Sequence, residues 1–144
     1  MKSAKNLLIA IPFFLLSCSK GGDTPTPTPP TPPPPVTPTE APIAFTVNVD
    51  PGAGNILGVV GNSQPIIVKI SSTLPSAGAT VGVTVLKDAD NTSVFNNSIS
   101  TVNADNTITI TGLTPGALCT ATVVVTSKAT STNSKAVTFK LAAK

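Results

Sequence analysis

From Ala41 to the C-terminus, hydrophobic and polar residues alternate along the chain with a period of two. This period is typical of β-strands that turn one face to a core and the other to solvent. The runs are short and rich in valine, isoleucine and threonine, and no helical period competes with them. The pattern predicts seven strands, at residues 43–49, 65–71, 80–88, 92–100, 106–111, 117–127 and 135–142.

One face of each run is apolar, and these faces define the expected core. The predicted core residues are Ile43, Phe45, Val47, Val49, Ile66, Val68, Ile70, Val81, Val83, Val85, Ile108, Ile110, Cys119, Ala121, Val123, Val125, Val137, Phe139 and Leu141. The run around Val94 and Phe95 is the weakest strand candidate, although Phe95 is also expected in the core. Turn-forming residues separate the runs. Seven short strands in about 100 residues predict an all-β fold, an immunoglobulin-like antiparallel β-sandwich over residues 43–144.

The last three predicted strands add a resemblance. Residues 110–141 are similar to the end of a fibronectin type III domain, in which a leucine and a Pro-Gly turn precede a tyrosine and alternating valines follow. Leu113, Pro115 and Gly116 match that pattern. Cys119 stands where the family has its tyrosine, and the family's tryptophan is missing. The resemblance implies a fibronectin type III-like sandwich, with another immunoglobulin-like family as the alternative.

The N-terminal segment is expected to be a secretory signal peptide rather than a transmembrane helix. A basic stretch, MKSAK, precedes the apolar NLLIAIPFFLLS, which is too short to span a bilayer stably. Leu15, Leu16, Ser17 and Cys18 resemble the lipobox of bacterial lipoproteins. The resemblance implies that residues 1–17 are removed and that Cys18 carries lipid, an anchor that becomes stable with two or more chains. The alternative is an ordinary signal peptide with an incidental cysteine.

A proline-rich segment follows the cysteine. Residues 24–42 contain ten prolines in nineteen positions, which favours an extended polyproline II arm of roughly 60 Å. Residues 18–42 are therefore expected to be a disordered linker, with a ligand for a proline-recognising domain or a glycosylated stalk as alternatives. Cysteine, polar stretch and Pro-Thr ladder together resemble lipoproteins of the Bacteroidota, which implies the outer membrane but leaves its face open.

Charge excludes one class of partner. Charged residues make up 10% of the chain, and its nine basic residues are all lysine. From residue 18 onward, seven lysines face six acids and form no cluster. Without arginine the chain lacks bidentate phosphate recognition, so no nucleic-acid partner is expected.

Candidate chemistry is sparse. The chain has no histidine, and Cys119 lies on an inward-facing run without an activating partner. We therefore expect no enzymatic activity, no catalytic residue and no cofactor. Asp88 and Asp90 lie in the segment KDADNTS and are weak calcium candidates, but a tight turn is the simpler interpretation.

The segment 50–64 is unusually long for a turn. Its apolar residues Ile56, Leu57, Val59 and Val60 either tuck against the sandwich as an irregular edge or extra strand, or form an exposed contact patch.

Taken as a whole, the sequence predicts a membrane-attached, non-enzymatic spacer, adhesive or protein-interaction module with an envelope or surface protein as partner. A glycan-binding accessory lipoprotein is the alternative, weakened by the lack of tryptophan and tyrosine.

Overall fold

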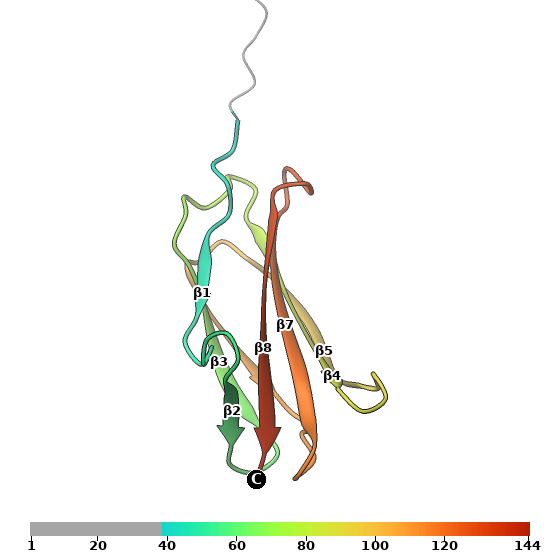
Figure 1. Cartoon of the computed structure of the whole chain (residues 1–144). Coiled ribbons are helices and arrows are strands. Elements are labelled where there is room, and N and C mark those ends of the chain that lie inside the picture. The colour runs from blue at the N-terminus through green and yellow to red at the C-terminus, as the bar shows by residue number, and fades with distance from the viewer. Residues whose placement is uncertain (1–38) are drawn as a thin grey trace, which may run out of the picture. The chain divides into compact units, whose positions relative to one another are not determined.

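The computed structural model describes residues 39–144, which form an all-β domain of eight strands in two packed sheets (Figure 1). Residues 1–38, with the predicted signal peptide, Cys18 and most of the Pro-rich segment, lie outside the described residues. The strands are β1 (Phe45–Val47), β2 (Ile56–Val59), β3 (Gln64–Ile70), β4 (Ala79–Lys87), β5 (Ser93–Thr101), β6 (Asp105–Ile110), β7 (Leu118–Ser127) and β8 (Ser134–Ala143). The predicted β-sandwich is confirmed.

The two sheets differ in size. One has the order β1-β3-β6 and the other the order β2-β8-β7-β4-β5. Five strand pairs are antiparallel, whereas β2 and β8 are parallel. β2 is the extra strand that was one interpretation of the segment 50–64. Its parallel pairing with β8 departs from the antiparallel sandwich that the sequence predicted. The connection after β1 carries the chain to the edge of the other sheet, where β2 runs in the direction of β8.

The core lies between the sheets and follows the predicted alternation. Ile66, Val68 and Ile110 of the smaller sheet, and Val81, Val83, Val85, Val123, Val125 and Leu141 of the larger one, are completely buried. Val49 and Val137 are half-buried at the rim of this cluster. Phe95 is also only half-buried, so its placement in the core was wrong. The reason is that β5 is the last strand of its sheet and pairs with β4 alone.

The chain enters and leaves the domain at opposite ends. Residues 39–44, here called the leading segment, lie at the end that carries the β3–β4 and β7–β8 connections, and the C-terminus lies at the other end (Figure 1). At the former end, Gly78 has a φ of +81° and a Cβ there would stand 2.5 Å from the carbonyl oxygen of Thr101. Glycine is required at this position both by the backbone conformation and by the close approach of β5.

Candidate functional site

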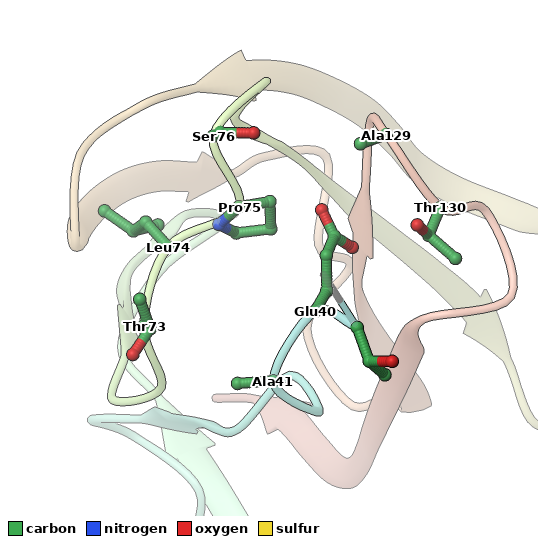
Figure 2. A pocket seen from close by; sticks show the side chains of 9 residues that line it. Glu40, Ala41, Thr73, Leu74, Pro75, Ser76, Ala129 and Thr130 are labelled. Carbon is green, nitrogen blue, oxygen red and sulfur yellow. The ribbon is translucent and has the colours of Figure 1, made fainter. Parts of the chain in front are cut away.

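A cavity opens at the end of the sandwich where the leading segment lies. Its volume is about 520 Å³, within the range of small-molecule sites. Three segments line it: Thr39–Ala41, the β3–β4 connection through Thr73–Ser76, and the β7–β8 connection through Ala129 and Thr130 (Figure 2). The lining combines hydroxyl groups with the apolar side chains of Leu74 and Pro75, so it suits a ligand that has both polar and apolar parts.

Asn133 fixes one wall of this cavity by holding the leading segment. Its Oδ1 accepts a hydrogen bond from the backbone N–H of Ile43 at 3.0 Å. Its Nδ2 donates to the carbonyl oxygen of Ala41 at 3.0 Å and to Oε2 of Glu40 at 3.3 Å. Glu40 and Ala41, which the sequence places in the linker, are thus bound to the folded domain.

Glu40 brings the cavity its negative charge. Figure 2 shows its side chain projecting into the space between Pro75 and Ala129. The Ser127 hydroxyl, with Asn133 and Thr130, lowers the pKa of Glu40, while burial acts in the opposite direction. Oε1 is shielded from solvent and has no hydrogen-bond partner at bonding distance. The carboxylate of Glu40 is therefore held in the wall of the cavity, beside the side chains of Ser127, Asn133 and Thr130.

Sequence reasoning missed this cavity. Glu40 stands inside a proline-rich run, and that composition indicates a linker. The cavity also joins Glu40 to residues about 90 positions later in the chain. The single available signal was an acidic residue at the point where the prolines end and the first apolar alternation begins.

The segment around residues 56–60, expected either to tuck against the sandwich or to form an exposed contact patch, does partly both. Val59 is completely buried and Leu57 packs half-buried on the core, so part of the segment is an extra edge strand. Ile56 and Val60 are 54% and 90% exposed. The backbone N–H of Lys144 donates to the carbonyl oxygen of Val59 at 2.9 Å, which secures β2 beside the chain end.

The two weak calcium candidates occupy the β4–β5 turn, and both make bonds within the domain. Oδ2 of Asp88 lies 2.7 Å from Nζ of Lys140, and its Oδ1 accepts a hydrogen bond from the hydroxyl of Thr120. Lys140 and then Thr120 lower the pKa of Asp88. Oδ1 of Asp90 accepts from the backbone N–H of Thr92 at 2.9 Å, and this bond lowers its pKa. Within residues 39–144, no three His, Cys, Asp or Glu side chains gather where they could hold a metal ion.

Cys119 lies on the inward face of β7 as a free thiol, 1% exposed. Burial, and next the negative charge of Asp88, raise its pKa, while Lys87 acts in the opposite direction. A raised pKa disfavours the thiolate, which is the reactive form of cysteine. Cys119 therefore serves as a packing residue of the core.

The free edge of β5 is the second candidate site. The nine residues of β5 form one end of the five-stranded sheet. From Asn91 to Ala104 the chain has neither a charged residue nor a proline. The backbone N–H of Ser98 is bonded to the Oδ1 of Asn97 at 2.8 Å, so this N–H has no neighbouring strand as its partner. Such an edge can add a strand from another chain.

No protein-family model matches this chain, and a search of curated proteins found no match. Across residues 39–144, the structure holds no helix of the length and apolarity needed to cross a membrane.

Proposed function

We propose that this protein is a lipid-anchored protein of the cell envelope whose β-sandwich is a non-enzymatic protein-interaction module. The free edge of β5 is the observation that carries the proposal, because a long, uncharged edge strand offers a row of backbone groups to a partner strand. In this proposal the cavity at Glu40 is separate from the protein contact.

The sandwich belongs, on this proposal, to the immunoglobulin-like folds of fibronectin type III type. Assigning β1, β3 and β6 as strands A, B and E makes β4, β5, β7 and β8 strands C, C′, F and G, with β2 as an additional strand beside G. Strands A, B and E on one sheet, with C, F and G on the other, follow the immunoglobulin-like division. The match of Leu113, Pro115 and Gly116 to the family's turn before strand F supports the same assignment.

Anchoring through Cys18 rests on the lipobox resemblance, and the Pro-rich arm supports a site in the outer membrane. In cells supplied with a labelled fatty acid, the native full chain is expected to take up the label and the Cys18→Ala chain is expected to lose it. Cys119→Ala is the matched control, since it also removes one cysteine and should keep the label. A Cys18→Ala chain that is labelled like the native chain would contradict lipid anchoring through Cys18.

The interaction itself can be tested by placing a photo-crosslinking amino acid at Ser98 of the full chain in its native membrane. Exposed Ser131 in the β7–β8 connection is the control position. We expect a protein adduct from position 98 and little from position 131. If neither position gives an adduct, or if both give the same one, the β5 edge is not the contact site.

Glycan binding at the Glu40 cavity is the second candidate function. The specific observation is a cavity of about 520 Å³ that is lined by the acidic residue Glu40 and by the hydroxyl-bearing residues Thr73, Ser76 and Thr130. Sugar hydroxyls donate to carboxylates and to hydroxyl oxygens alike. On a panel of immobilised glycans, Glu40→Gln should lose any binding seen for the native chain, and Asp50→Asn should keep it. A native chain that binds no glycan on the panel rules this function out for the sugars tested.

A further inference from the structure

We propose that the partner of the β5 edge is a second copy of this chain, paired antiparallel with Asn97 opposite Asn97 of the other copy. This inference rests on the proposed function, since it names the partner of the same edge. It joins the five-stranded sheets of two copies into one continuous sheet.

Among the edges of the two sheets, β5 is the one suited to such pairing. β1 and β2 are three and four residues long, which limits the number of bonds a partner can form with them. β6 is longer but begins with a charged residue, Asp105. Natural edge strands are protected by shortness, charge, proline or a bulge. β5 has nine residues without charge or proline, and the register shift in its pairing with β4 lies near one end, at Val85 and Leu86.

The backbone of β5 directs the groups needed for pairing away from its own sheet. Alternate residues of an edge strand direct their N–H and C=O groups away from the sheet. The bond from the N–H of Ser98 to its neighbouring side chain identifies Ser98 as one of these residues, and Asn96 and Ser100 share its direction by alternation. With Asn97 at the centre, Asn96 lies opposite Ser98 of the second copy. Both residues direct their N–H and C=O groups away from β4 there, so the two backbones can exchange a pair of hydrogen bonds once the N–H of Ser98 leaves the Oδ1 of Asn97.

The side chains select this register over its neighbour. With Asn97 at the centre, Phe95 lies opposite Ile99 of the second copy, and this pair occurs twice because of the two-fold symmetry. Aromatic and β-branched residues are favourable cross-strand partners. Both side chains are only half-buried in the single domain and pack at the rim of its core. A register centred on Ser98 would instead set Phe95 opposite Thr101 and Ile99 opposite Asn97.

Asn97 changes its bond when the edges pair. In the single domain its Oδ1 covers the N–H of Ser98. In the paired edge that N–H bonds to the carbonyl oxygen of Asn96 from the second copy. The two Asn97 side chains then face each other across the symmetry axis, where each amide has a donor and an acceptor for the other.

The expected arm permits this arrangement on one membrane. Antiparallel pairing puts the leading segments of the two copies at opposite ends of the joined sheets. Strands of ten residues, such as β7 and β8, are about 34 Å long at ~3.4 Å per residue. Because residues 39–42 are held on the domain, residues 24–38 set the expected reach of the arm, roughly 46 Å at ~3.1 Å per residue, which still exceeds that length. Attachment to a common membrane also raises the effective concentration of one copy near another.

Single cysteines in the full membrane-bound chain test both the pairing and its register. Asn97→Cys puts two thiols opposite each other at a distance suited to a disulfide. Asn96→Cys is the matched control on the same strand, because its thiol faces Ser98 of the second copy rather than another cysteine. After mild oxidation and electrophoresis without reductant, we expect the Asn97→Cys monomer band to be replaced by a reducible band of twice its mass. The Asn96→Cys chain should pair as well but form no disulfide, so it should run as a monomer on the same gel.

Each other result overturns the inference. An Asn97→Cys chain that stays monomeric, or equal dimer from both variants, means that β5 does not pair with itself in this register. A disulfide adduct of a different mass shows that β5 binds another protein, which overturns self-pairing and leaves the proposed interaction function standing. If the photo-crosslinking amino acid at position 98 gives no protein adduct, by contrast, the proposed interaction function is overturned as well.

Discussion

Asn133 binds Ile43 across 90 residues of sequence, its side-chain Oδ1 accepting the backbone N–H of Ile43 at 3.0 Å. The same amide donates to the carbonyl oxygen of Ala41. One side chain from the β7–β8 connection therefore holds Ala41 and Ile43, which precede the residues that pair with β3. It sets where the domain begins and forms a wall of the Glu40 cavity.

Asn133→Ala is expected to destabilise the domain and loosen the leading segment. The change removes the partners of two backbone groups, which should cost about 1–2 kcal/mol in the free energy of unfolding. Thr132→Ala, one position away and exposed, is the control and should change stability little. Urea unfolding followed by far-ultraviolet circular dichroism measures both. Equal stability of the two variants would show that Asn133 does not hold the segment.

Gly78→Ala should be the more damaging of two matched glycine changes. Gly78 and Gly54 share a φ of +81°, but a Cβ at Gly54 meets open space while one at Gly78 stands 2.5 Å from the carbonyl oxygen of Thr101. Gly54→Ala should cost about 1 kcal/mol for the backbone conformation alone, and Gly78→Ala about 3 kcal/mol or more. Thermal unfolding compares them. Similar costs would mean that the β3–β4 connection yields easily to the added atom.

Cys119 should make stability depend on pH in the alkaline range. Its pKa in the folded chain lies above the ordinary value of 9.0, so the unfolded chain loses this proton first. The contribution is fully present below the ordinary pKa and is lost as pH rises toward the raised one. Stability measured from about pH 7 to 10.5 should therefore fall less for Cys119→Ala than for the native chain. Parallel curves would contradict a thiol kept protonated by burial.

Asp88 should depend on Lys140 for its low pKa. The pKa of Asp88 in the folded chain lies below the ordinary 3.8, so its contribution to stability is present above the ordinary pKa and is lost as pH falls through the lowered one. In Lys140→Met the pKa should rise toward the ordinary value, as carboxyl carbon chemical shifts in an NMR titration would show. Lys135→Met, on the same strand, should leave it unchanged. An unaltered Asp88 pKa in Lys140→Met would assign the shift to Thr120 instead.

The strands that the sequence predicted best are those in the middle of the sheets. In β4 and β7 the buried residues alternate strictly with less buried ones, because a central strand has one face on the core along its whole length. β2 was harder to predict, since Ile56 and Leu57 are adjacent and Gly58 follows, so no period is visible. Phe95 was misplaced because alternation specifies the face of a strand but not whether a neighbouring strand covers it. The Glu40 cavity was invisible because its walls come from segments that are distant in sequence.

The way residues 39–44 are attached also determines how the domain responds to mechanical tension. A pull on this segment, with the domain held at β5, acts first on the amide of Asn133. It acts next on the backbone bonds of Ala44 and on the three residue pairs that join β1 to β3. The nine pairs between β4 and β7, which carry the larger sheet, lie further along the path of the force. Tension would thus release β1 and lengthen the tether before it disturbs β5. For a chain anchored and bound as proposed, the attachment would work as an extensible joint between the membrane and the β5 contact.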